Sequence, residues 1–186
     1  MDLKERIGVS TIKSLEKKHL SDFLKGLSRI PNVHLIGPYF DEDQTPIVSF
    51  NIGHADRILH PRFVTKLLND LFGIQSRAGC SCAGPYGHLL LGIDTSTSAE
   101  FRKFILKGKN GIKPGWVRIN IHYTFTSDDI AFLLRAIAFV VEKGPLFLPL
   151  YTFDLLTAEW RHRNDEEHFP SFSGTSSFAP LTPSSP

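Results

Sequence analysis

The chain has 186 residues, with 21 lysines and arginines, 19 aspartates and glutamates and 41% hydrophobic residues. This length and composition are typical of one globular domain, and we do not expect a second complete one. The formal charge of +2 and the lack of a long run of like charges argue against nucleic-acid binding. Two cysteines exclude a disulfide framework and favour a reducing compartment. No signal segment and no membrane-length apolar stretch are visible, so we expect a cytoplasmic protein.

The first third of the chain predicts a long helix followed by two short strands. Apolar residues recur every three or four positions across residues 9–30, with Ser10 or Thr11 as the cap and Pro31 as the stop. The runs 33–36 and 46–52 are short and apolar and flank a polar turn. Such runs are typical of neighbouring strands.

The middle of the chain predicts a second helix, a short strand and a loop. Residues 61–72 carry one apolar helical face, and Gly73 follows as a stop signal. Residues 74–77 predict a strand, and residues 78–87 form a loop rich in small side chains. The run 88–93 predicts one or two helical turns.

The remaining elements complete an α/β pattern. A helix is predicted with Ser96 or Thr97 as its cap and Phe101, Phe104 and Ile105 as its apolar positions, and residues 107–115 predict a solvated basic turn that closes it. Residues 116–123 alternate strictly, which predicts a strand with Val117, Ile119 and Ile121 on one face. A helix over 130–142 with Thr126 as its cap, a hairpin within 146–162 and a disordered tail over 164–186 follow. The order of elements predicts an α/β fold with helices packed on a small mixed sheet.

Two groups of residues could carry chemistry. Cys80 and Cys82 lie in the small-residue loop, where a thiol could be reached by a substrate or could simply be buried. Their spacing, with His88 and His122 scattered elsewhere, is a weak metal signal. Arg118 lies in the middle of a strand, opposite its aliphatic face, where a guanidinium could grip a carboxylate or face solvent. His122 shares that predicted face.

Separated motifs resemble one enzyme family. The runs RAGCSCAGPYGHLLLGID (77–94) and KPGWVRINIHYTFTSDDIAFLLRAI (113–137) resemble the C-terminal part of class V aminotransferase-like enzymes. These are pyridoxal-phosphate proteins that include the cysteine desulfurases. Residues 7–38 resemble the join between their large and small domains, and residues 148–163 resemble an extension of some members. The resemblance therefore implies the C-terminal domain of a fold-type I pyridoxal-phosphate enzyme.

The resemblance also implies roles for single residues. Arg77, Gly79 and Cys82 match the desulfurase order R-x-G-x-x-C, in which the cysteine accepts sulfur as a persulfide. Arg118 falls on the arginine that binds the substrate carboxylate, and Arg77 is a second substrate-binding candidate. Desulfurases typically carry histidine where Cys80 stands. Transaminase, lyase and desulfurase chemistry therefore all stay open, as does the substrate.

The resemblance further divides the chain and assigns its partners. Residues 1–30 join a large domain to the small domain of residues 31–163, and residues 164–186 form the tail. The complete enzyme binds pyridoxal phosphate and an amino acid and forms homodimers, whereas this chain lacks the cofactor lysine motif and is expected to bind no cofactor alone. Whether it is itself an enzyme stays open. The alternatives are a non-catalytic truncated homologue that folds and docks onto a partner, and a thiol or metal carrier using Cys80 and Cys82.

Overall fold

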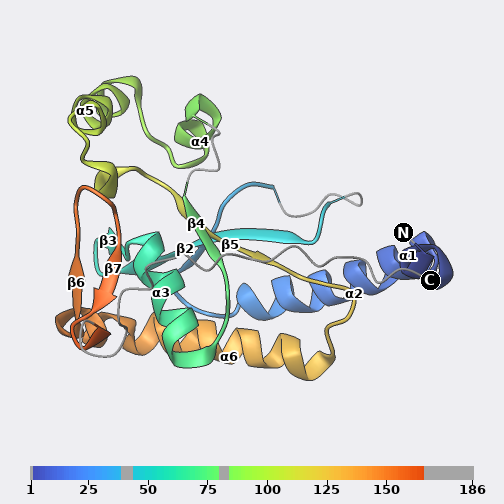
Figure 1. The fold of residues 1–186 in the computed structure, drawn as a ribbon. Coiled ribbons are helices and arrows are strands. Elements are labelled where there is room, and N and C mark those ends of the chain that lie inside the picture. The colour runs from blue at the N-terminus through green and yellow to red at the C-terminus, as the bar shows by residue number, and fades with distance from the viewer. Residues whose placement is uncertain (1, 39–43, 80–83, 166–186) are drawn as a thin grey trace, which may run out of the picture.

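An antiparallel sheet with helices on one face forms the centre of the computed structural model, which describes residues 2–38, 44–79 and 84–165 (Figure 1). Four of its five strands lie side by side in the order β1 (Val33–Leu35), β2 (Ile47–His54), β5 (Trp116–Asn120) and β4 (Arg77–Gly79). The short strand β3 (Arg57–Ile58) pairs with β2. Each of these pairings is antiparallel.

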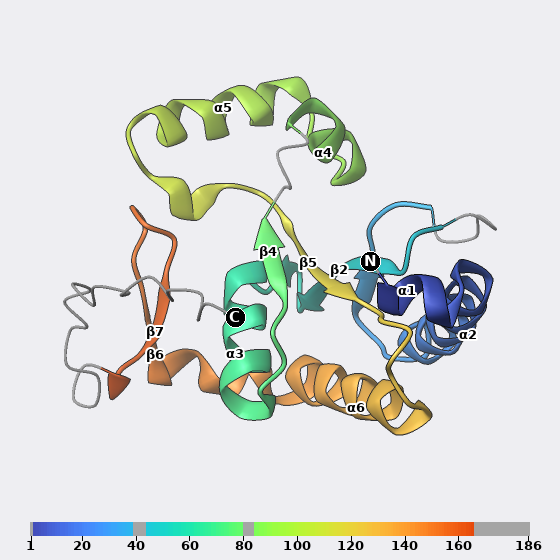
Figure 2. The same cartoon turned by 45° about the vertical axis from the view of Figure 1, so that its right-hand side comes forward.

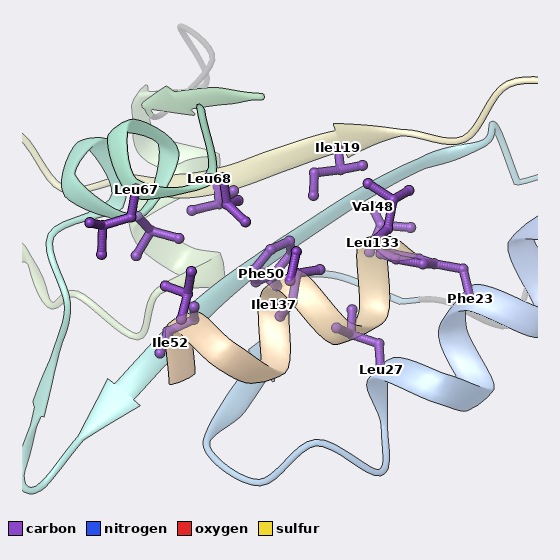
Figure 3. Packing of buried hydrophobic residues seen from close by; sticks show 14 of the residues in the cluster. Phe23, Leu27, Val48, Phe50, Ile52, Leu67, Leu68, Ile119, Leu133 and Ile137 are labelled. Atoms are coloured by element: carbon purple, nitrogen blue, oxygen red, sulfur yellow. The ribbon is translucent and has the colours of Figure 1, made fainter. Parts of the chain in front are cut away.

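Three helices pack on the same face of this sheet. They are α2 (Val9–Leu27), which continues from α1 (Asp2–Ile7), α3 (Pro61–Phe72) and α6 (Ser127–Lys143). Phe23 and Leu27 of α2 and Ile137 of α6 meet Phe50 of β2 and Leu67 of α3 in one apolar cluster (Figure 3). These five side chains are essentially inaccessible to water, so their burial supplies much of the hydrophobic stabilisation. The α/β fold class expected from the sequence is confirmed.

The alternation of strand β5 separates a core face from a polar face. Val117 and Ile119 are buried against the helices, as predicted, and so is Ile121 just beyond the strand. Trp116 and Arg118 lie on the opposite face, because successive strand residues point to opposite sides. The strand ends at Asn120, earlier than predicted.

Local sequence signals explain most element ends. Thr126 caps α6 in a reciprocal capping box with Asp129, and Gly73 ends α3 with a left-handed φ of 67°. Two predicted caps are wrong. Gly8, not Ser10 or Thr11, precedes α2, and Asp94 caps α5 (Thr95–Leu106) by accepting a 2.8 Å hydrogen bond from the Thr97 amide.

Two peripheral units flank the sheet. Helices α4 (Gly84–Leu90) and α5 form an arm that extends away from the three packed helices (Figure 2), and α5 buries none of its residues. After the arm comes a short 3-10 turn, η1 (Asn110–Ile112).

The second unit is a hairpin of β6 (Tyr151–Phe153) and β7 (Trp160–His162). A hairpin was predicted within 146–162, but its first residues belong to a 3-10 helix, η2 (Gly144–Leu150), so the strands are shorter. The tail expected over 164–186 lies almost entirely outside the described residues. Of the helices in the described ranges, none is long and apolar enough to cross a membrane.

Candidate functional site

A cavity of about 380 Å³ lies where strands β4 and β5, the start of α3, the η1 region and the hairpin meet. Its polar lining comes from His60, Arg62, Arg77, Asn110, Lys113 and Arg118. The rest of its wall comes from Pro61, Ala78, Gly79, Gly115, Trp116 and Ala158. We call this cavity the arginine pocket. It has the size of a small-molecule site, with several polar groups converging on one space.

The sheet register brings the two predicted substrate arginines together. Arg77 of β4 lies directly opposite Arg118 of β5 in the antiparallel ladder, so both side chains leave the same face. The prediction for β4 placed it at 74–77, whereas the observed strand is Arg77–Gly79. Gly79 ends it with a φ of 136°, a conformation that favours glycine. Arg118 is half-buried and Arg77 is exposed, so the pair can be reached by a ligand.

Arg62 is held at the edge of the arginine pocket by the hairpin. Its Nη1 donates to the carbonyl oxygens of Thr157 and Ala158, each at 3.3 Å. Ala158 itself has a left-handed φ of 64°, unusual for a residue other than glycine, and is buried. The hairpin turn therefore fixes a cation that no sequence motif marks.

His60 joins the hairpin to the wall of the arginine pocket and has a defined tautomer. The indole Nε1 of Trp160 donates to His60 Nδ1 at 3.2 Å, and a tryptophan indole is only a donor. The proton of the neutral ring is therefore on Nε2, which donates to the Gly111 carbonyl at 3.0 Å. Burial is the largest influence on the pKa of His60 and lowers it, the Gly111 hydrogen bond opposes this shift, and the charge of Arg62 adds to it.

The η1 turn belongs to the arginine pocket as well. Asn110 and Lys113 line the cavity, although the sequence pattern of residues 107–115 predicts a solvated turn. Gly115 is held by Asn51, a buried residue of β2 whose Nδ2 donates to the Gly115 carbonyl at 3.1 Å. The pattern of the turn could not show this, because basic and glycine residues are equally common in turns without a ligand.

The other sequence candidates do not join this cavity or fall outside the description. Cys80 and Cys82 lie outside the described residues. His122 is in a turn after β5 and bonds through Nδ1 to Thr124 Oγ1 at 2.8 Å. His88 bonds to Ser98 Oγ at 2.8 Å. The described ranges hold no group of three or more histidines, cysteines, aspartates or glutamates placed to bind a metal ion.

Comparisons with known proteins identify the family of the chain. Residues 1–133, which carry both Arg77 and Arg118, match the family model "Aminotransferase class-V". The chain belongs to the class V aminotransferase family.

Two relatives of this family member are cysteine desulfurases by name. A probable cysteine desulfurase of Streptomyces coelicolor is 32% identical over 101 residues, which are 54% of this chain and 23% of that protein. The apo structure of a cysteine desulfurase from Thermococcus onnurineus NA1 superposes with a TM-score of 0.55 and 27% identity. That match covers 74% of this chain and 28% of the other. The chain thus spans about a quarter of the length of these two proteins.

Proposed function

We propose that this class V family chain supplies the substrate-carboxylate side of a pyridoxal-phosphate enzyme with cysteine desulfurase-like chemistry. In this proposal Arg118 binds the α-carboxylate of an amino-acid substrate, and the positive charge of Arg77 helps to balance the negative charge of that carboxylate. The observation that carries the proposal is the register of β4 and β5, which places the two arginines opposite each other beside one cavity. A guanidinium is suited to this task because its planar fork can donate two parallel hydrogen bonds to a carboxylate.

The described residues do not by themselves fit the cofactor. Pyridoxal phosphate acts as an electron sink, and the family holds its pyridinium nitrogen with an aspartate. No acidic side chain is among the described residues that line the arginine pocket. We therefore assign the chain no cofactor-dependent step, and we expect it to form no borohydride-reducible imine with pyridoxal phosphate when alone. A stoichiometric reducible adduct would contradict this part of the proposal.

Cys82 is the proposed sulfur-accepting thiol. The support is the sequence order Arg77, Gly79, Cys82, together with the position of the first two residues in the wall of the arginine pocket. Neighbouring positive charge favours the thiolate form, which is the nucleophile. Alkylation by iodoacetamide measures this directly. Cys82 in a Cys80→Ser chain should react faster than Cys80 in a Cys82→Ser chain, and equal rates would count against the assignment.

Carboxylate binding by the 186-residue chain tests the central claim. Propionate is a suitable probe because it presents a carboxylate without the ammonium group that the cations would repel. Trp116 lines the arginine pocket, so its indole N–H resonance should shift as propionate binds. Replacing Arg118 by Gln should weaken binding about tenfold or more, because hydrogen bonds between charged groups are lost. The matched control is Arg57→Gln, since the Arg57 side chain is 86% exposed on β3. Equal affinity in the two variants would overturn the proposal.

The same titration separates this function from a non-catalytic docking module. The observation behind that alternative is apolar exposure at the N-terminal end, where Leu3 and Val9 are each 65% exposed. A large exposed apolar surface is typical of an interaction site. A docking module needs no carboxylate site. If the Trp116 indole resonance does not shift when propionate is added, the result would favour that alternative.

A further inference from the structure

The arginine pocket carries more positive charge than one carboxylate can balance. Arg62, Arg77, Lys113 and Arg118 all line it, and no acidic side chain does so among the described residues. Within the described ranges, Arg62, Arg77 and Lys113 form no ion pair. Cations gathered around one space repel one another, and the repulsion is relieved when anions enter.

One turn further along α3, the same chain treats a structural cation differently. Lys66 there is paired with Asp70 at 3.0 Å and with Asp165 at 3.3 Å, so two carboxylates balance one ammonium group. Asp70 also accepts a 2.8 Å hydrogen bond from the Tyr151 hydroxyl. Arg62, Arg77 and Lys113 form no such pair with a described acidic side chain, which indicates that an anionic ligand balances their charge.

The guanidinium group of Arg62 is held in one orientation by hydrogen bonds. Its two hydrogen bonds to Thr157 and Ala158 engage Nη1 and leave the donors of Nε and Nη2 for another partner. The hairpin that holds it is anchored at several points. Gly111 N donates to the Leu155 carbonyl at 2.8 Å, Asn110 Nδ2 donates to the Leu156 carbonyl at 3.0 Å, and Trp160 donates to His60. A guanidinium held in this way loses little further freedom when it binds an anion.

The hairpin lies outside the part of the chain that matches the family. The match ends at residue 133, whereas the Arg62 contacts come from residues 157 and 158. Arg77 and Arg118 therefore lie within the family match, whereas the contacts that fix Arg62 come from a later segment, which resembles an extension of some family members. A feature that only some family members carry is suited to distinguish one substrate from another.

We propose that the arginine pocket binds a ligand with two anionic groups, one at Arg118 and Arg77 and the second at Arg62 and Lys113. The inference rests on the proposed function, because the first group is the α-carboxylate of that proposal. It deepens that function by naming the substrate class as an amino acid whose side chain carries a negative charge. Arg62 and Lys113 are the specificity-determining residues.

Succinate and propionate form a matched pair of probes, since succinate adds a second carboxylate to the same short carbon chain. We expect the 186-residue chain at low ionic strength to bind succinate at least about tenfold more tightly than propionate, measured by the Trp116 indole resonance. Raising the salt from about 0.01 M to 1 M shortens the screening length from about 30 Å to 3 Å, so the preference should shrink.

Substitutions locate the second anionic group. Arg62→Gln with Lys113→Gln should bring the succinate to propionate ratio within about twofold while propionate affinity stays within about twofold of the native value. Lys113→Gln alone makes no change to the hairpin contacts and should lower the ratio partway. The Trp160 indole resonance reports whether the hairpin stays docked on His60 in every variant. Arg57→Gln is again the control.

The outcomes separate the two proposals. A native chain without preference for succinate, or a preference that survives the double substitution with the hairpin docked, would overturn this inference and leave the proposed function standing. If Arg118→Gln leaves the affinity for propionate unchanged, the proposed function is overturned. Inorganic phosphate is the third probe. If it binds more tightly than succinate and loses affinity in the same variants, the cations form a phosphate cradle and the dicarboxylate inference fails.

Discussion

Replacing Gly111 by alanine should detach the hairpin from the wall of the arginine pocket. A Cβ atom at this position would lie 2.6 Å from Phe153 Cζ and 3.0 Å from the Leu155 carbonyl oxygen. Ordinary carbon contacts are near 3.5–4.0 Å, so the ring must move by about 1 Å. The ring cannot move away freely, because it stacks on Trp160 with centroids 4.7 Å apart and also contacts His60 at 5.0 Å.

The magnitude follows from two opposing effects. Overpacking of this kind costs about 1–3 kcal/mol. Gly111 has no left-handed φ, so alanine also restricts the unfolded chain and returns about 0.4–1 kcal/mol. Gly84→Ala is the matched control, because nothing lies within 4 Å of its added Cβ and it too lacks a left-handed φ. The difference in unfolding free energy between the two variants should therefore be about 1–3 kcal/mol.

Urea unfolding followed by tryptophan fluorescence measures that difference, and native-state amide exchange shows where it acts. The amides of Ala158 and Asp154, bonded within the hairpin, should exchange about 5- to 150-fold faster in Gly111→Ala, since 1.4 kcal/mol corresponds to a factor of ten. Equal stability of the two alanine variants, with hairpin amides that exchange at native rates, would contradict this prediction. Such a result would mean that the hairpin accommodates the methyl group without leaving the pocket wall.

Two further predictions concern a helix cap and a histidine. Thr126→Ala removes the hydrogen bonds that join the hydroxyl to the amide and carboxylate of Asp129, so α6 should lose about 1 kcal/mol in urea unfolding; an unchanged midpoint would contradict the capping role. For His60, the pKa is lowered on folding, so its contribution to stability is present above the unfolded value near 6.5 and is lost as pH falls through the lower folded value. The unfolding free energy should accordingly fall more steeply between pH 7 and 5 in the native chain than in His60→Gln. Identical slopes would show that burial and the nearby charge of Arg62 do not hold the ring neutral.

The element pattern was largely predictable because local signals decide it. The helix over 61–72, its stop at Gly73 and the capping residue Thr126 follow from spacing and from residues with strong conformational preferences. Where two neighbouring residues could each cap a helix, the sequence does not show which of them does so. Asp94 and Ser96 are both good caps, and Asp94 prevails because its carboxylate reaches the Thr97 amide and hydroxyl together.

Only those residues of the candidate site that lie in a recognisable sequence pattern could be predicted. Arg118 is marked by its position in an alternating strand and by the family resemblance, and Arg77 by the motif before the cysteine. Arg62, Lys113 and His60 carry no comparable mark. His60 and Arg62 become part of the arginine pocket through contacts with residues about 50 to 100 positions away, such as His60 with Gly111 and with Trp160.

The sequence by itself therefore determined the kinds of element, the apolar face of each and the family to which the chain is similar. It did so because hydrophobic periodicity and turn chemistry act over a few neighbouring residues. Only the tertiary structure decided that Arg77 lies opposite Arg118 and that a distant hairpin fixes Arg62 beside them. The physical reason is that strand register and hairpin docking depend on the packing of the whole sheet and its helices, which no local stretch of sequence specifies.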